Sequence, residues 1–404
     1  MAGEWLTSRE AARRLGVSAA TLYAYVSRGL LRSEGTEGQR ERRYRADDIS
    51  RLKRRRDVGR KAESIANHAL DFGTPVLESA LTLIEDNRLH YRGRDATELA
   101  RTASLEEVAR LLWDCDEQPF AADNVPPMTA ELRRAWLAAA TLGPVDRCLV
   151  LLPAAAALDH QSWVEERGAM LETGVRVLRL LAAAVTAQPP SPLPVHEQLA
   201  AAWRVPPARA PLLRAALVLS ADHEFNASAF AARVVASTGA NLYGATMAGL
   251  AALNGPRHGG LTRRVATLFD DLRKARNLDA ELVQRIRDRI YIPGFGHQLY
   301  PDGDVRAATL FALLREAVPN SPELAFAERL AAAGERLIDR KPNVDFTTVV
   351  VERVLGLPKD SALALFLLGR TVGWIAHALE QSAHAALIRP RARYTGPRPQ
   401  DRTS

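Results

Sequence analysis

Residues 362–379 read ALALFLLGRTVGWIAHAL, and this stretch decides the fold. Its apolar side chains recur at steps of three and four residues, which is the period of an α-helix. The same spacing recurs in seven other segments, whereas the alternating pattern of strands is scarce. The sequence therefore predicts an all-α body. The other helical segments are residues 105–113, 132–142, 174–185, 210–219, 229–237, 265–272 and 307–317.

Three local features interrupt the helical pattern. Residues 82–91 are expected to form a short hairpin around Asp86-Asn87. The proline-rich residues 189–194 and the polar tail after Gly396 are expected to be loops. The longest apolar run, residues 149–158, is too short to span a bilayer and is expected to be a core helix.

Composition limits the class of protein. The chain has 404 residues, 47% of them apolar, so more than one domain is expected. Cys115 and Cys148 are the only cysteines, and the N-terminus lacks a basic-then-apolar signal pattern. We therefore expect a cytoplasmic protein without a membrane partner.

Three short islands contain the candidate chemistry. They are Asn-Gly-Pro-Arg-His-Gly-Gly at 254–260, Pro-Gly-Phe-Gly-His at 293–297 and Pro-Asn-Val-Asp-Phe at 342–346. Each places one ionisable side chain, His258, His297 or Asp345, on a turn. Two histidines and one aspartate are a sufficient set for removing a proton beside one carbonyl and attacking a second carbonyl. Taken singly, His258 and Asp345 could instead be helix caps.

From residue 78 to residue 391 the chain resembles the citrate synthase family. The three islands carry the resemblance, together with residues 89–95, Gly373-Trp374-Ile375-Ala376-His377 and Arg389-Pro390-Arg391. The resemblance implies an all-α homodimer with a large domain and a small domain, the latter at about 254–357. It also implies condensation of an acyl-CoA with oxaloacetate. The sequence leaves acetyl-CoA and propionyl-CoA open, because one methylene changes binding by only ~1–3 kcal/mol.

The resemblance also implies individual roles. Asp345 would be the general base, His258 would stabilise the enolate oxygen, and His297 would polarise the ketone of the oxo acid. His223, Arg306, Arg370 and the partner subunit's Arg389 would bind oxaloacetate, and Phe366 would shield the site. Each arginine taken alone is more typical of a surface salt bridge. The backbone of Pro293, Gly294, Phe295 and Gly296 would approach the CoA thioester, which is a substrate. We expect no cofactor and no metal, since no cluster has metal-ligand spacing.

Some positions depart from the family pattern. Pro301-Asp302 stand where a basic residue is usual, Val305 replaces proline, and Arg257 replaces leucine. The walls around the chemical residues therefore differ more than these residues do. His377 and Trp374 are expected to be structural.

The first 60 residues form a separate, basic module. Residues 1–64 contain 16 basic and 9 acidic side chains, which account for the whole net charge of +7. A Thr7-to-Glu10 capping box opens one helix, and residues 16–18 form a turn before a second helix at 19–28. A β-wing at 40–45 and a third helix at 47–56 follow. The module resembles the winged helix-turn-helix of MerR-like and excisionase proteins.

The resemblance implies that residues 19–28 enter a DNA major groove. The candidate DNA contacts are Thr21, Tyr23, Arg28, Arg42, Arg43 and Arg45. Alternatively, the module has only a solvated basic face, or it contacts protein. These alternatives leave a second function open for the whole chain, a DNA-binding regulator whose body senses oxo acid or acyl-CoA with little turnover.

Overall fold

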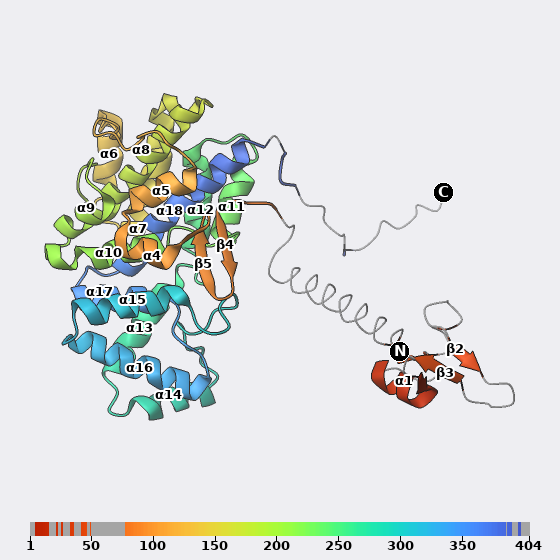
Figure 1. The fold of residues 1–404 in the computed structure, drawn as a ribbon. Helices are drawn as coiled ribbons and strands as arrows, with labels where there is room; N and C mark the ends of the chain where they lie inside the picture. Colours follow the sequence, from red (N-terminus) through yellow and green to blue (C-terminus); the bar gives the residue numbers. More distant parts are fainter. Residues whose placement is uncertain are drawn as a thin grey trace, which may run out of the picture. The chain divides into compact units, whose positions relative to one another are not determined.

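The computed structural model describes residues 5–15, 22, 26, 33–35, 42–46, 49, 77–384, 386–389 and 395–396. The chain divides into two compact units, residues 1–78 and 79–404 (Figure 1). Each unit has its own hydrophobic core.

The N-terminal unit contains a small antiparallel sheet and one described helix. Its elements are β1 (Trp5–Thr7), α1 (Ser8–Leu15), β2 (Ser33–Gly35) and β3 (Arg42–Arg45), with strand order β1-β3-β2. The predicted capping box is confirmed, because the Thr7 amide donates to Glu10 Oε2 at 2.9 Å and the Glu10 amide donates to Thr7 Oγ1 at 3.3 Å. Strand β1 was not predicted. The buried core is formed by Leu6, Ala11, Leu15, Leu22, Tyr44, Ala46 and Ile49.

The predicted β-wing is present as the β2–β3 pairing, in which Ser33 is opposite Tyr44 and Gly35 is opposite Arg42. Arg43 and Arg45 are exposed on this sheet. The other predicted DNA contacts, Thr21, Tyr23 and Arg28, lie outside the described residues, as does the Arg42 side chain. The predicted turn at 16–18 and most of the two predicted helices at 19–28 and 47–56 also lie outside them.

The second unit is helical, as predicted, with one small sheet at its start (Figure 1). The sheet contains β4 (Thr82–Glu85), β5 (Arg88–Tyr91) and β6 (Arg94–Asp95). The α-helices are α4 (Ala96–Thr102), α5 (Leu105–Trp113), α6 (Ala130–Ala138), α7 (Pro144–Leu158), α8 (Arg167–Thr186), α9 (Val195–Ala202), α10 (Ala210–Leu219), α11 (Ala227–Ala236), α12 (Leu242–Leu253), α13 (Leu261–Arg273), α14 (Leu278–Arg287), α15 (Val305–Ala317), α16 (Pro322–Ile338), α17 (Val344–Leu355) and α18 (Ser361–Ser382). Two 3₁₀ turns, His160–Trp163 and Pro207–Arg209, connect helices.

The predicted hairpin at 82–91 is confirmed. Asp86 and Asn87 both have positive φ, +50° and +58°, which is the geometry of the tight turns that match the twist of antiparallel strands. The hairpin contacts two distant loops. Thr82 Oγ1 donates to Asp222 Oδ2 at 2.6 Å, and Asn87 Nδ2 donates to the Gly303 carbonyl at 3.1 Å.

Helix α18, which contains residues 362–379, is the centre of this unit. It packs against α5, α8, α10, α11, α12 and α17. It is long and apolar enough to cross a membrane, but its apolar window is wholly buried by the surrounding helices, so it is a core helix. Trp374 and His377 are fully buried, as predicted. A Cβ on Gly249 of α12 would lie 2.6 Å from the Trp374 ring, so glycine is needed at this crossing.

Predicted helix boundaries agree with the structure at 105–113 and 210–219, and the other predicted segments lie in or overlap observed helices, of which α6 ends at Ala138, before the predicted end at residue 142. Helices α4, α9, α12, α14 and α16 were not predicted. Helix α9 has only 8 residues, and the small and apolar residues of α12 leave little contrast between its faces.

Candidate active site

Two of the three islands are joined by backbone hydrogen bonds. The Asn343 amide donates to the Gly294 carbonyl at 2.9 Å, and the Gly296 amide donates to the Lys341 carbonyl at 2.8 Å. These bonds form a short bridge between Phe295 and Pro342. Because His297 follows the first segment and Asp345 follows the second, the bridge fixes the two turns beside each other.

Glycine is required in this bridge for conformational reasons. Gly294 and Gly296 have φ values of +91° and +74°, which side-chain-bearing residues adopt only with strain. A Cβ on Gly296 would also lie 2.7 Å from Arg340 Cδ. The Phe295 ring is buried against Phe346 at 5.2 Å, so only its backbone is available to a ligand.

Asp304 connects Arg306 to the start of α17. Its carboxylate accepts from Arg306 Nε at 2.9 Å and from Arg306 Nη2 at 2.8 Å, and it also accepts from the Val344 amide at 2.9 Å. Burial alone would lower the pKa of Arg306, but Asp304 outweighs that effect, and the pKa is raised. Arg306 therefore stays charged although it is almost completely buried.

Asp345 lies in the first turn of α17 without capping it. The N-cap is Asn343, whose Oδ1 accepts from the Phe346 amide at 3.3 Å, so the alternative that Asp345 is a helix cap is wrong. The Asp345 side chain is partly buried, and loss of hydration raises the pKa of its carboxyl to about 7. A carboxyl with this pKa can take up and release a proton near neutral pH.

His258 lies on the turn between α12 and α13. Its Nε2 is 2.8 Å from Ser228 Oγ, and its ring meets Phe366 edge-on at 6.1 Å. The N-cap of α13 is Gly260, so the helix-cap alternative for His258 is also wrong. Burial lowers the pKa of His258 to about 4, and the charge of Arg370 adds to this effect. The ring is therefore neutral at physiological pH.

His297 and His223 lie against each other, with ring centroids 4.9 Å apart in an edge-to-face arrangement. The Leu299 amide donates to His297 Nδ1 at 3.2 Å, so the ring proton of neutral His297 lies on Nε2. Burial lowers the pKa of His297 to about 4, helped by Arg306. Burial also holds the pKa of His223 well below its usual value.

Arg370 projects from α18 and is 1% exposed. Its Nε donates to the Ser220 carbonyl at 2.8 Å, its guanidinium lies 5.0 Å from the Phe366 ring, and its buried Nη2 has no hydrogen-bond partner among the described residues. Burial lowers its pKa to about 10, which still leaves it charged at neutral pH. A buried cation with an unused donor is costly unless an anion binds there.

The charge of Arg370 contributes to the pKa of His223, of His258, of His297 and of Asp345. These four residues therefore lie close enough to Arg370 to be influenced by its charge. Phe366 is buried one turn before Arg370, and Pro293 and Gly294 are also buried. Arg389 is exposed on the short segment after α18, which the Ile388 amide anchors to Ser237 Oγ at 3.1 Å. This unit alone does not bring Arg389 to the residues around Arg370.

Three residues of this buried cluster around Arg370 were missed in the sequence. They are Ser228, which contacts His258; Asp304, which binds Arg306; and Tyr300, whose hydroxyl is 3.0 Å from His223 Nε2. Asp304 had a weak local signal, because a carboxylate two residues before an arginine can pair with it. Among the described residues, no group of three His, Cys, Asp or Glu side chains is placed to hold a metal ion.

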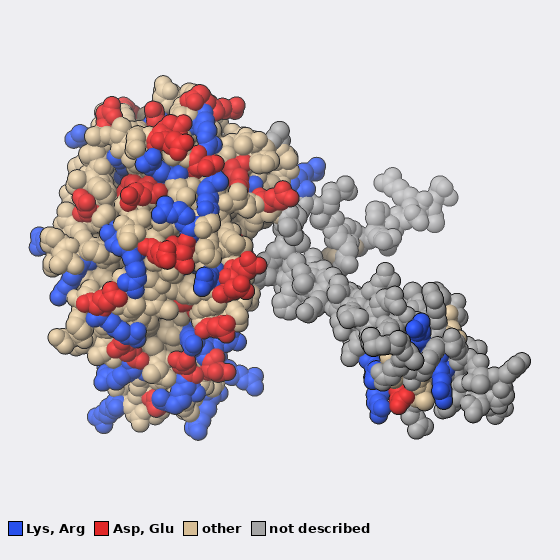
Figure 2. Space-filling view, viewed as in Figure 1, with Lys and Arg blue, Asp and Glu red and all other residues tan. Residues whose placement is uncertain are grey.

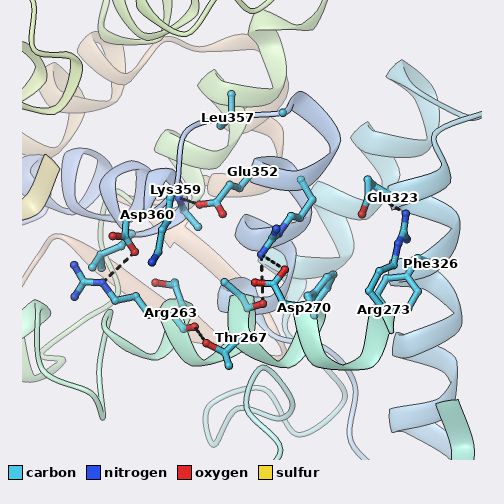
Figure 3. Close-up of a pocket in the computed structure, with 17 residues that line it drawn as sticks. Arg263, Thr267, Asp270, Arg273, Glu323, Phe326, Glu352, Leu357, Lys359 and Asp360 are labelled. Carbon is cyan, nitrogen blue, oxygen red and sulfur yellow. Dashed lines mark hydrogen bonds and ion pairs between the residues drawn. The ribbon is translucent and has the colours of Figure 1, made fainter. Parts of the chain in front are cut away.

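A separate groove of about 770 Å³ runs along α13, under the corner between α17 and α18 (Figure 3). Its arginines are paired with carboxylates, as in Arg263–Asp360 at 3.1 Å and Arg353–Asp270 at 2.8 Å. None of His258, His297 and Asp345 lines it. The buried cluster around Arg370, and not this groove, contains these three side chains.

The cluster defines a class of protein. An all-α enzyme with two neutral imidazoles, a carboxyl of raised pKa and buried arginines is suited to removing a proton from a weak carbon acid beside an anionic second substrate. The family model described as citrate synthase, C-terminal domain, matches residues 70–391, and that of a helix-turn-helix domain matches residues 5–57. This chain belongs to the citrate synthase family.

Individual proteins agree with this assignment. The chain is 31% identical over 337 residues to citrate synthase of Mycolicibacterium smegmatis, covering 77% of this chain and 90% of that protein. It is 37% identical over 186 residues to 2-methylcitrate synthase 2 of Corynebacterium glutamicum, covering 45% and 48%. It also resembles the ternary complex of citrate synthase from Thermoplasma acidophilum with carboxymethyl coenzyme A and oxaloacetate. That match has a TM-score of 0.70 and 25% identity, and it covers 81% of this chain and 96% of the other.

Proposed function

We propose that this protein condenses an acyl-CoA, acetyl-CoA or propionyl-CoA, with oxaloacetate, giving citrate or 2-methylcitrate and free CoA. The observation that carries the proposal is the buried, partly unpaired Arg370, surrounded by neutral histidines and by a carboxyl whose pKa is about 7. A dianionic oxo acid would satisfy this cation together with Arg306. The relatives named citrate synthase and 2-methylcitrate synthase support the same substrate class.

The residues divide the reaction between them. Asp345 takes a proton from the carbon next to the thioester. His258 donates a hydrogen bond to the thioester oxygen as negative charge develops there. The resulting carbon nucleophile attacks the ketone of oxaloacetate, which His297 polarises through its Nε2 proton. Water then cleaves the thioester and releases CoA.

Further residues bind the substrates in this proposal. His223, Arg306, Arg370 and the partner's Arg389 hold oxaloacetate, with a large domain and a small domain at about 254–357 closing over it. The small domain would close before acyl-CoA binds productively. The backbone at Pro293, Gly294, Phe295 and Gly296 faces the CoA thioester, and Phe366 shields the cluster. The protein would act as a cytoplasmic homodimer without a metal or prosthetic group.

A thiol-release assay tests this proposal. Purified full-length protein should release CoA from acetyl-CoA or propionyl-CoA only when oxaloacetate is present. Release without oxaloacetate would indicate simple thioester hydrolysis. Absence of release with both thioesters would favour the alternative that the body is a ligand sensor.

A second function, DNA binding by the N-terminal unit, is favoured by the helix-turn-helix match and by the placement of the whole net charge in residues 1–64. The body displays interspersed charges of both signs on the face in Figure 2. Because each phosphate contact releases counterions, binding should weaken steeply with salt. A dimer would present two such units, so paired half-sites are expected. Deleting residues 1–60 should abolish binding and leave condensation nearly intact. Full-length protein without salt-dependent DNA binding would favour a protein-contact role.

A further inference from the structure

Tyr300 is a residue of the buried cluster around Arg370, and the proposed reaction assigns no role to it. It is 2% exposed, and its hydroxyl lies 3.0 Å from His223 Nε2. Its ring centroid lies 5.5 Å from that of His223 and 5.1 Å from that of His297, and the Arg306 guanidinium lies 5.4 Å from it. Tyr300 therefore touches three of the side chains proposed to bind or polarise oxaloacetate.

The hydroxyl of Tyr300 has one place to donate its proton. Burial raises the pKa of Tyr300 to about 12, so the phenol keeps its proton at neutral pH. Among the described residues, only His223 Nε2 is within hydrogen-bond distance of it. Native structures seldom leave a buried hydroxyl without an acceptor. Tyr300 therefore donates, and Nε2 of His223 accepts.

This direction determines where the His223 proton lies. The ring is neutral, so it carries one proton, and an Nε2 that accepts from Tyr300 leaves that proton on Nδ1. His223 Nδ1 makes no hydrogen bond to a described residue, so it is available to a ligand oxygen.

Leu299, the residue just before Tyr300, has the opposite effect on His297. The Leu299 amide donates to His297 Nδ1, which leaves the proton of His297 on Nε2. The short turn is closed by the Tyr300 amide, which donates to the His297 carbonyl at 3.2 Å. Two consecutive residues thus set the tautomers of two adjacent histidines, and each histidine presents a donor.

We propose that Tyr300 is a positioning residue that fixes His223 in the Nδ1-protonated tautomer, so that His223 donates a hydrogen bond to an oxygen of the oxo acid. The identity of the ligand, an oxo acid, rests on the proposed function. The tautomer of His223 does not depend on turnover, because Tyr300 and His223 are in contact without substrate.

The test compares Tyr300→Phe with Tyr243→Phe in the full-length protein. Both changes remove a buried phenol hydroxyl, but that of Tyr243 binds Asp159 Oδ2 at 3.0 Å, away from His223. Nitrogen NMR of histidine-labelled protein, with His223 assigned by His223→Asn, reports which ring nitrogen is protonated. Wild type and Tyr243→Phe should show His223 protonated at Nδ1. Tyr300→Phe should show a mixture with the Nε2-protonated form.

Binding gives the second readout. Tyr300→Phe should weaken oxaloacetate binding about tenfold, the size of one ordinary hydrogen bond, and raise its KM, while kcat at saturation changes less than threefold. In the His223→Asn background the same change should have no further effect on binding. Nε2-protonated His223 in wild type, an unchanged tautomer in Tyr300→Phe, or unchanged oxaloacetate affinity would each overturn the proposal.

The design separates this inference from the proposed function. If wild type releases no CoA but shows the Nδ1 tautomer and its loss in Tyr300→Phe, the proposed function fails and the positioning role stands. If Tyr300→Phe does not fold, the wild-type spectrum alone decides, because the Nε2-protonated form there would contradict the inference.

Discussion

Two regions of the body, the groove along α13 and the buried cluster around Arg370, handle charge differently. In the groove along α13, Arg263, Arg273 and Arg353 each pair with a carboxylate. Figure 3 shows Arg263 beside Asp360 and Arg273 beside Glu323. In the cluster, Arg370 is buried with a donor unused, and burial raises the pKa of Asp345 to about 7. Each groove arginine has a carboxylate partner, although Nε of Arg353 lacks a hydrogen-bond partner, whereas no carboxylate among the described residues forms an ion pair with Arg370. An arginine without a carboxylate partner and a carboxyl of raised pKa therefore mark the candidate functional site.

The largest expected effect comes from the carboxyl of the cluster. Asp345→Asn keeps the shape of the side chain but removes the base, so kcat should fall by ~10² or more. Oxaloacetate should still bind, because the arginines remain. Steady-state kinetics and calorimetry together test this. An equal loss of oxaloacetate affinity would mean that Asp345 binds substrate and is not the base.

The next effect separates a cluster arginine from a groove arginine. Arg370→Leu should weaken oxaloacetate binding by ~10- to 150-fold, because charge-assisted hydrogen bonds contribute ~1.5–3 kcal/mol. The matched control is Arg353→Leu, which removes an arginine already paired with Asp270. Its oxaloacetate affinity, measured by calorimetry, should be unchanged. Similar losses in both variants would remove the distinction between the two regions.

The pH dependence is a further test of the cluster. Asp345 acts as a base only when it is ionised, so kcat/KM for acyl-CoA at saturating oxaloacetate should rise about tenfold per pH unit below its pKa and level off above it. The pKa of about 7 should be a lower limit in this complex, because bound oxaloacetate adds negative charge nearby. His258 and His297 have pKa values of about 4 in the free protein, so they are neutral there between pH 6 and pH 8. A flat profile between pH 6 and pH 8, about one unit on either side of that pKa, would contradict the role of Asp345.

The smallest effect is expected in the groove. Asp270→Asn breaks an ion pair whose side chains are 31% and 56% exposed, so the free energy of unfolding should fall by ~0–1 kcal/mol. Condensation activity should stay within about twofold. Denaturant unfolding measures the first quantity and the thiol assay the second. A severe loss of activity with normal stability would show that the groove belongs to the catalytic machinery.

Much of this candidate site could be predicted because its residues lie in short, recognisable segments of the sequence. His258, His297 and Asp345 each follow a turn of Gly, Pro or Asn. The helical spacing of the apolar residues at 362–379 predicts α18. The predicted grouping is supported by the hydrogen bonds between residues 294–296 and 341–343.

The electrostatics could not be predicted, because they depend on contacts between distant residues. Asp304 binds the Val344 amide, 40 residues away, and Ser228 binds His258, 30 residues away. The choice of helix cap was likewise ambiguous, since Asn343 and Asp345 are both suitable residue types. Pairing of the Asn343 amide with Gly294 holds Asn343 in an extended conformation, with φ −107° and ψ −178°, and this makes Asn343 the cap. The Asp345 carboxyl is therefore not used as the helix cap and is available to the buried cluster around Arg370.

One measurement tests the central claim, that the cluster removes a proton from the acyl carbon and joins that carbon to an oxo acid. The protein is incubated with oxaloacetate and with acetyl-CoA that is fully deuterated in its methyl group, and the products are weighed by mass spectrometry. Removal of a single deuteron by Asp345 predicts citrate that retains the other two. Fully deuterated acetate, with free CoA and no citrate, would show that the protein only hydrolyses the thioester and would contradict the account.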